Sequence, residues 1–319
     1  MLRRLLPVFL ITVMAVPAWS VTCSLTASST LPVSVDQASG MVQRSDGRLV
    51  IADTYNNRLI EFTESGSFIT THGPFLASPY GSLNKPSGIA RDAAGNLYVA
   101  DQFGHRVVKF DPSMNPIATW GTLGSGPGQL RYPTNLAFSP DGSVLYVTEL
   151  LGHRVSMFTP AGAFLGSFGS PGSGPGQFNN PFGIAIDAVG NVLVADELNH
   201  RIQTFTASGV YLSSFGTFGS GPGQFHFPVG LYFDSAWNLY VADQHNYRVQ
   251  MLTASGTPIC EFGTPGSALG QFNSPWFACP LRDGSVLVGD TYNYRLVMYV
   301  FGATPTRSPS WGALKTRYR

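Results

Sequence analysis

A short phrase recurs six times along the chain, and its spacing constrains the fold more than any other feature. The copies read IADTYNNR, VADQFGHR, VTELLGHR, VADELNHR, VADQHNYR and VGDTYNYR. Their acidic residues are separated by 48, 48, 47, 47 and 47 positions, and an arginine follows each of them five places later. Periods of this length are typical of propellers and solenoids, in which each repeat is one supersecondary unit.

Each repeat predicts four short strands. The copy PFGIAIDAVGNVLVADELNHRIQTFTASGVYLSSFG holds the β-rich runs FGIAI, NVLVAD, RIQTFT and VYLSSFG, separated by turn residues. One four-stranded blade cannot bury both of its faces, so neighbouring blades must pack together and close into a ring that leaves only short edges. The sequence therefore predicts an all-β fold, a six-bladed β-propeller of four-stranded antiparallel blades.

The N-terminal residues 1–20 have the features of a secretory signal peptide. Arg3 and Arg4 precede an apolar stretch, and the small residues Ala18 and Ser20 suit a cleavage site. The apolar run is shorter than the ~20 residues of a spanning helix, so no transmembrane anchor is expected. We therefore expect a secreted or periplasmic protein. A lipid anchor at Cys23 is a less favoured alternative, because Ser20-Val21-Thr22 lacks the usual leucine and small residue before the cysteine.

Two further segments flank the repeats, which occupy residues 37–301 and form one domain. The last repeat is incomplete after Phe301, so we expect the N-terminal segment 21–36, around Leu31–Asp36, to supply the closing strand of blade six. Residues 302–319 form a basic C-terminal tail with four basic residues and no acid.

Composition and charge exclude some classes of function. The formal net charge is +1 and charged residues are only 12%, without a basic block inside the repeats, so a nucleic-acid partner is not expected. In the body of the chain only Cys260 and Cys279 occur, on an outer strand and on the next inner strand by the repeat register. Their separation disfavours a bond between them, and we expect two buried free thiols, although the sequence leaves one bridge open.

The phrases P-x-G-I-A-x-D, G-N-L-Y-V-A-D, N-x-R-V and G-x-G-x-G-Q-F together resemble the NHL repeat over residues 37–301. The resemblance implies a six-bladed propeller. It does not imply one function, because the family includes extracellular sensor domains, scaffolding or RNA-binding modules, and an enzyme, the peptidyl-α-hydroxyglycine α-amidating lyase.

The resemblance to the amidating lyase implies zinc-binding histidines in the place that follows the proline of the repeat. Here those places hold Ser39, Ser87, Thr134, Phe182, Val229 and Trp276. None of these side chains is a zinc ligand, so the zinc site of the lyase does not carry over. The histidines that do recur, His105, His153 and His200, lie on loops of adjacent blades, too far apart for one ion. We therefore predict no metal and no cofactor.

The repeated acid and arginine flank a hairpin loop, where a cross-strand ion pair or loop-fixing hydrogen bonds are the expected role. The acids are Asp53, Asp101, Glu149, Asp196, Asp243 and Asp290, and the arginines are Arg58, Arg106, Arg154, Arg201, Arg248 and Arg295. Because a binding site rarely needs one group in six equivalent places, we expect these twelve residues to be structural.

Ligand-binding candidates lie where the copies differ. The six inner-strand positions are polar in blades one to three and apolar in blades four to six, which predicts a two-sided pocket at the channel mouth. The loop face around it is rich in aromatic and imidazole side chains, which are typical of recognition surfaces. The candidates are Ser39, Ser87, Thr134, Phe182, Val229 and Trp276 at the channel, and Tyr55, His105, His153, His200, Tyr247 and Tyr294 on the loops, with Phe103, His245 and Tyr292 on the same face.

These observations favour a monomeric, non-enzymatic binding or scaffold module that recognises a protein, peptide or glycan through its loop face. The alternative is a secreted propeller enzyme, a hydrolase or lyase, with a site unlike the zinc site of the amidating lyase.

Overall fold

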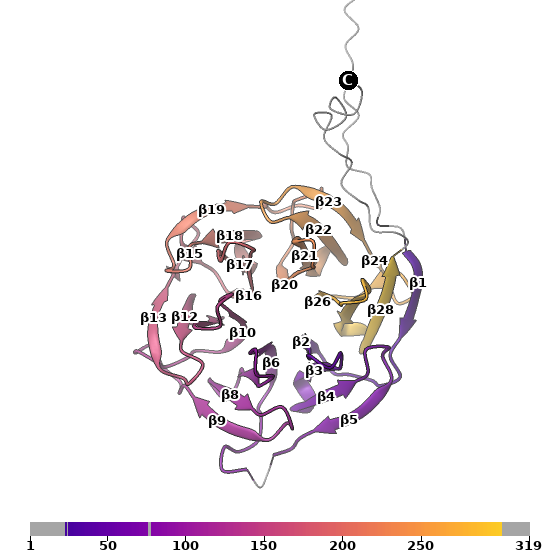
Figure 1. The fold of residues 1–319 in the computed structure, drawn as a ribbon. Helices are drawn as coiled ribbons and strands as arrows, with labels where there is room; N and C mark the ends of the chain where they lie inside the picture. The colour runs from indigo at the N-terminus through magenta and orange to yellow at the C-terminus, as the bar shows by residue number, and fades with distance from the viewer. Residues whose placement is uncertain (1–22, 24, 76–77, 302–319) are drawn as a thin grey trace, which may run out of the picture.

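The computed structural model describes residue 23, residues 25–75 and residues 78–301. The predicted signal peptide and basic tail lie outside the described residues. Six sheets of four antiparallel strands stand around a central axis and close into a ring (Figure 1). The prediction of an all-β, six-bladed propeller is confirmed.

The blades follow one another in chain order, each with its first strand at the axis and its fourth at the rim. Blade one comprises β2 (Ala38–Gln43), β3 (Leu49–Asp53), β4 (Arg58–Phe62) and β5 (Phe68–His72). Blade two comprises β6 (Pro86–Arg91), β7 (Leu97–Asp101), β8 (Arg106–Phe110) and β9 (Pro116–Trp120). Blade three comprises β10 (Pro133–Phe138), β11 (Leu145–Glu149), β12 (Arg154–Phe158) and β13 (Phe164–Phe168).

Blade four comprises β16 (Pro181–Ile186), β17 (Val192–Asp196), β18 (Arg201–Phe205) and β19 (Tyr211–Phe215). Blade five comprises β20 (Pro228–Phe233), β21 (Asn238–Asp243), β22 (Arg248–Thr253) and β23 (Pro258–Phe262). Blade six comprises β26 (Pro275–Pro280), β27 (Val286–Asp290), β28 (Arg295–Phe301) and β1 (Leu25–Thr30). Two short parallel pairs, β14 (Ser170–Pro171) with β15 (Gln177–Phe178) and β24 (Thr264–Pro265) with β25 (Gln271–Phe272), lie in the connections between blades.

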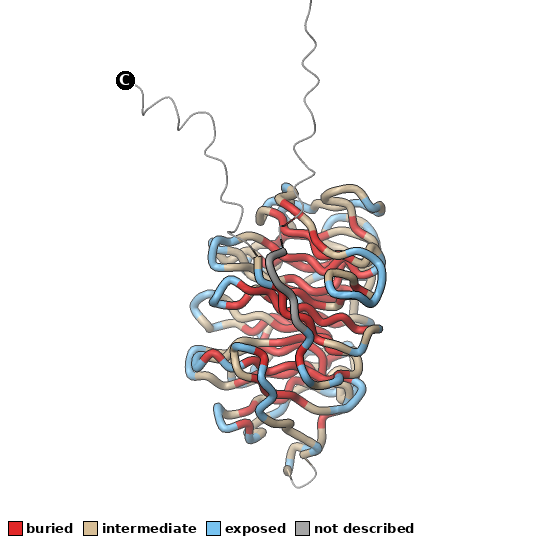
Figure 2. The backbone as a smooth tube through the Cα atoms, turned by 90° about the vertical axis from the view of Figure 1, so that its right-hand side faces the viewer, coloured by how far each residue is buried: buried red, intermediate tan, exposed pale blue. Residues whose placement is uncertain are grey.

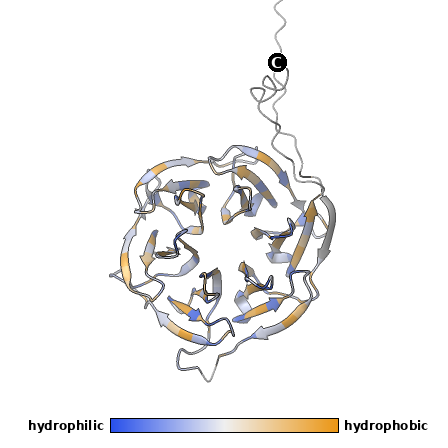
Figure 3. Ribbon diagram, in the orientation of Figure 1, coloured by the Kyte–Doolittle hydropathy of each residue, from blue (hydrophilic) through white to orange (hydrophobic). Residues whose placement is uncertain are grey.

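Burial explains the different patterns of the four strands. The second strands, such as LVIAD and VLVAD, are buried at every position because a neighbouring blade covers each face. The outermost strands β9 and β13 alternate between half-buried and exposed residues instead. Buried residues fill the middle of the ring wall, and exposed residues gather on the loops of its two faces (Figure 2). Hydrophobic residues accordingly lie along the strands within the blades (Figure 3).

Closure of the ring joins the N-terminal segment to the last repeat. β1 pairs antiparallel with β28, from Leu25 opposite Phe301 to Thr30 opposite Val297. The closing strand is therefore Leu25–Thr30 rather than the Leu31–Asp36 segment that the sequence favoured. That segment instead crosses from blade six to blade one, where the buried Leu31 and Val35 join a core cluster shared by both blades.

A disulfide between Cys23 and Cys260 fastens the start of the closing strand to blade five. The expectation of two free thiols is thus wrong for Cys260, while Cys279 is buried and free. The bond also corrects the lipid-anchor alternative, since the sulfur of Cys23 has no valence left for a lipid. Disulfides are typical of proteins outside the reducing cytoplasm. Among the described residues, no helix is long and apolar enough to cross a membrane.

Candidate ligand-binding site

The repeated acid and arginine hold the loops between the second and third strands. In all six blades the arginine Nε lies 2.6–2.8 Å from a carboxylate oxygen whose side chain is fully buried. In blade four, Asp196 also accepts hydrogen bonds from the backbone N–H of Asn179 and from Asn199 Nδ2. Each pair thus joins a loop to the connection that enters its own blade, and the carboxylates are closed to a ligand.

The three recurring histidines link neighbouring blades. His105, His153 and His200 have left-handed backbone conformations, with φ of 51–56°. The Nδ1 atom of each accepts a hydrogen bond from a backbone N–H in the connection to the next blade, at 3.2–3.3 Å. In blade one, Asn57 Oδ1 accepts the equivalent bond from the N–H of Lys85 at 2.8 Å.

Burial is the main cause that lowers the pKa of all three imidazoles below the ordinary value, although nearby aspartates partly oppose it at His153 and His200. The lowered pKa favours the neutral ring, which alone can accept the backbone N–H at Nδ1. Within the described part of the chain, no three His, Cys, Asp or Glu side chains are placed to hold a metal ion.

The channel-mouth pocket that the sequence predicted is not open in the structure. Ser39, Ser87, Thr134, Phe182 and Val229 are all buried, and only Trp276 is partly exposed. Two of the polar members are bonded within their own blades: Ser39 Oγ accepts a hydrogen bond from Thr54, and Thr134 Oγ1 lies 2.9 Å from Thr148 Oγ1. These five residues are therefore part of the buried inner wall of the ring.

The apolar members fill the channel near the axis. The rings of Phe182 in blade four and Trp276 in blade six are edge to face, with centroids 5.2 Å apart. Val229 and Leu150 belong to the same cluster, so four successive blades contribute to it. The inner strands begin close to the axis, so side chains from non-adjacent blades meet there. The predicted two-sided pocket is therefore wrong, and a small apolar core takes its place.

Loop residues of blades four and five form an aromatic cluster. The ring of His226 lies 5.0 Å from that of His245, 4.7 Å from that of Phe227 and 5.7 Å from that of His200. The rings contact one another across the blade boundary; His245 is exposed, and the other three are half-buried. Tyr247 is half-buried at the position where blades two to four have the bridging histidines.

Tyr55, Tyr292 and Tyr294 are the most exposed tyrosines of the loop face, at 49%, 54% and 55%. Together with other residues they line a cavity of about 320 Å³ where the last blade meets the first. We call this cavity the seam slot. It is lined by Asp36, Gln37, Tyr55, Thr291, Tyr292 and Tyr294.

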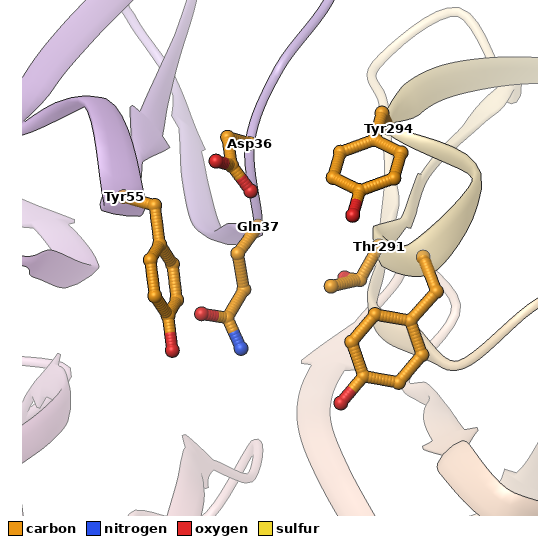
Figure 4. A pocket seen from close by; sticks show the side chains of 6 residues that line it. Asp36, Gln37, Tyr55, Thr291 and Tyr294 are labelled. Atoms are coloured by element: carbon orange, nitrogen blue, oxygen red, sulfur yellow. The ribbon is translucent and has the colours of Figure 1, made fainter.

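The two walls of the seam slot come from opposite ends of the repeat region. Tyr55, on the 3-10 turn η1 (Thr54–Asn56), stands on one side with Gln37 and Asp36 (Figure 4). Thr291, on the equivalent turn η4 (Thr291–Asn293), stands opposite with Tyr294 (Figure 4), and Tyr292 of the same turn also lines the slot. Side chains of the two walls face each other across the gap (Figure 4).

Repeat geometry fixes both walls. The backbone N–H groups of Thr54 and Tyr55 donate to the carbonyls of Gln37 and Asp36, and those of Thr291 and Tyr292 donate to Ser274 and Asn273. Gln37 and Tyr294 have positive φ angles of 57° and 53°, which turn the chain at the rim of the slot. The tyrosines therefore stand on turns whose backbone is already hydrogen-bonded.

A lysine covers the outer side of the first wall. Lys85 Nζ lies 3.9 Å from the ring centroid of Tyr55 and 4.5 Å from that of Phe103, in a cation–π arrangement. This contact fixes the Tyr55 ring and places a positive charge behind it.

A second hollow of about 470 Å³ lies between blades three and four, lined in part by Asp141, Tyr146 and Val189. Its polar groups already have partners: Tyr146 donates to the carbonyl of Ala207, and hydrogen bonds from Ser139 and Ser143 lower the pKa of Asp141 to about 2. It offers less to a ligand than the seam slot does.

Of the seam-slot residues, sequence reasoning selected Tyr55 and Tyr294 as candidates, placed Tyr292 on the same face and missed Asp36, Gln37 and Thr291. Asp36 and Gln37 lie at the start of the first repeat, and Thr291 occupies the position that Thr54 fills in blade one. A usable signal was the break in the first repeat, where Ala38 replaces proline.

This geometry defines the chain as a closed six-bladed propeller with an aromatic cleft at its seam. The NHL repeat model matches residues 83–110 and 178–205. These two segments therefore match the NHL repeat that the motifs indicated. A comparison with curated proteins finds no match.

Solved structures show the same fold at low identity. The chain is similar to a streptogramin B lyase, with 13% identity and a TM-score of 0.62 over 86% of this chain and 98% of that one. It is similar to a gluconolactonase from Xanthomonas campestris, with 16% identity and a TM-score of 0.62 over 86% and 89%. It is also similar to virginiamycin B lyase from Staphylococcus aureus bound to quinupristin, with 17% identity and a TM-score of 0.58 over 85% and 83%. These likenesses concern the fold alone.

Proposed function

We propose that this protein is an extracytoplasmic recognition module that binds its ligand at the seam slot. The observation that carries the proposal is that three half-exposed tyrosines, Tyr55, Tyr292 and Tyr294, line one cavity of about 320 Å³. Tyrosine provides a large contact area with a polar end at a small entropy cost, and it is enriched at binding surfaces. The cavity volume is at the lower end of the range for small-molecule sites.

The rest of the molecule supports this assignment. The disulfide and the predicted signal peptide favour a location outside the cytoplasm. The twelve repeated acids and arginines are used within the fold. Function is then expected where the repeats differ, and the seam is the place where the first and last copies meet.

Binding of the full chain to glycan and peptide arrays tests the proposal. We expect specific binding by the wild type and its loss in a Tyr55→Ala/Tyr294→Ala variant. Trp237→Ala is the matched control, since Trp237 is also exposed, at 47%, but lies on a β20–β21 turn away from the slot. Equal binding by the wild type and the double variant, or no binding to either array, would contradict the proposal.

One observation favours an enzyme as a second candidate. Burial raises the pKa of Glu197 to about 7, and such a carboxyl group can act as a general acid or base at neutral pH. Glu197 is the first residue of η2 (Glu197–Asn199). Leu150 occupies the same repeat position in blade three, and Leu150 packs against the apolar cluster of Phe182 and Val229 at the axis. Turnover of a gluconolactone or of quinupristin, abolished in Glu197→Gln, would support this candidate over the recognition module.

A further inference from the structure

Unpaired polar atoms are concentrated at one end of blade six. Among the described residues, six buried side-chain nitrogen or oxygen atoms have no hydrogen-bond partner. Three of them belong to Ser274, Trp276 and Thr291. These residues are adjacent, because the N–H of Thr291 donates to the carbonyl of Ser274 and Trp276 is two residues further along the chain. Buried polar groups without partners are rare and need an explanation.

Thr291 is the member of this group that lines the seam slot. Its side chain is only 1% exposed and points toward the facing wall, which places its hydroxyl at the base of the slot (Figure 4). Thr54 occupies the same repeat position in blade one, and its hydroxyl bonds both Ser39 Oγ and the carbonyl of Pro86 at 2.7 Å. In blade six Trp276 replaces the serine, and the buried Thr291 hydroxyl has no partner within the protein.

The base of the slot offers both donors and acceptors. The carboxylate of Asp36 accepts, the amide of Gln37 donates and accepts, and so does the hydroxyl of Thr291. A polyol matches this set, since each of its hydroxyls both donates and accepts. The walls are aromatic faces, whose negative π surface attracts the weakly positive C–H bonds on the flat side of a sugar ring.

Charge and backbone geometry disfavour the other ligand classes. Asp36 is the single carboxylate of the slot, and the ammonium of Lys85 already occupies the outer face of Tyr55, which opposes a second cation. An extended peptide would add to an unpaired strand edge. The backbone N–H groups of Thr54, Tyr55, Thr291 and Tyr292 are instead paired within the walls.

We propose, on the basis of the recognition function above, that the seam slot binds one pyranose ring of a neutral glycan. The ring lies between Tyr55 and the tyrosines of blade six, and its hydroxyls bond Thr291, Gln37 and Asp36.

Titration of the full chain with neutral methyl pyranosides and their oligosaccharides, followed by saturation-transfer NMR and calorimetry, tests this assignment. We expect Thr291→Val to weaken the affinity about tenfold, the loss of one hydrogen bond, while the melting temperature stays equal or rises. Thr54→Val is the matched control: it removes a hydroxyl with protein partners, so it should lower the melting temperature and leave the affinity unchanged. Tyr55→Phe should retain binding, whereas Tyr55→Ala should abolish it.

The two proposals fail in different ways. If the chain binds a peptide or a cation at the slot and no pyranoside, the glycan assignment is wrong and the recognition function stands. If Thr291→Val binds pyranosides as tightly as the wild type, the glycan assignment is also wrong. If no array ligand depends on the tyrosines, the recognition function itself fails.

Discussion

His153 joins blade three to the connection that enters blade four, and its bond needs a neutral ring. Its pKa in the folded protein lies below the ordinary value of 6.5. At pH values between the pKa of the folded protein and 6.5, the unfolded chain binds more protons than the folded one. Stability should therefore fall as the pH drops below about 6.5. We expect the free energy of unfolding, measured with urea from pH 5 to 8, to show this slope.

Replacement of the bridging histidines separates their role from general acid sensitivity. His153→Ala should cost about 1 kcal/mol at pH 8, because the N–H of Asn180 loses its acceptor. His153→Asn should recover most of that loss, since Asn57 makes the same bond at the equivalent left-handed position. The triple variant His105→Asn/His153→Asn/His200→Asn should lose the fall in stability below about pH 6.5 that the wild type shows. A slope that survives in the triple variant would show that other groups cause it.

Glu197 should respond to pH in the opposite sense. Its pKa is raised from 4.5 to about 7, so the folded protein binds more protons in that interval and stability falls as the pH rises through it. Glu197→Gln keeps the shape and removes the charge. We expect the variant to melt at a higher temperature than the wild type at pH 8 and at a similar temperature at pH 4.5. An equal difference at both pH values would mean that ionisation is not the cause.

At the scale of the strand, glycine permits the inner strands to approach one another. A Cβ atom on Gly183 of β16 would collide with the carbonyl oxygen of Val229 and lie 3.1 Å from the N atom of Leu231, both backbone atoms of blade five. Gly183→Ala should therefore destabilise the protein by about 3 kcal/mol or more, because the added methyl group would be overpacked against rigid backbone. In Gly126→Ala the new atom meets only the end of the Gln129 side chain, and the cost should be well below that. Chemical denaturation of both variants checks the difference.

The strands were predictable because each repeat carries its own signal. Alternation, turn residues and the 47–48-residue period are local properties, and they set the blades without reference to distant parts of the chain. The closing strand was misplaced because Leu31–Asp36 alternates like a strand, whereas Leu25–Thr30 becomes one through the open edge of β28. That pairing forms only when the two ends of the repeat region meet.

The candidate site was harder to predict for the same reason. Asp36 and Thr291 are far apart in the sequence and meet through ring closure, and Asp36 lies outside the repeated phrase. The inner-strand positions were expected at an open mouth, yet side chains from several blades converge at the axis and bury Phe182 and Val229. Exposure of Tyr55 and Tyr294 on the loop face followed from the repeat register alone.

At the scale of the whole molecule, the Cys23–Cys260 bond closes a loop of 237 residues over almost the entire ring. Constraining a loop of that length in the unfolded chain should stabilise the fold by about 2–5 kcal/mol. We expect Cys260→Ser to lower the melting temperature, and dithiothreitol to lower that of the wild type but not that of the variant. If dithiothreitol leaves the wild type unchanged, the bond contributes nothing to closure.

Cys279 provides an internal reference for the same experiment. Burial raises the pKa of its thiol to about 12, so it should not react with a thiol reagent until the protein unfolds. One thiol should therefore become reactive on unfolding of the oxidised chain.

The most direct test of the central claim is hydrogen–deuterium exchange of the full chain with and without the glycan that the arrays select. The account predicts slower exchange in peptides that contain Asp36 to Tyr55 and Thr291 to Tyr294, the two walls of the seam slot, and unchanged exchange elsewhere. Protection centred on the His200–His226–His245 cluster, or on the hollow between blades three and four, would contradict it.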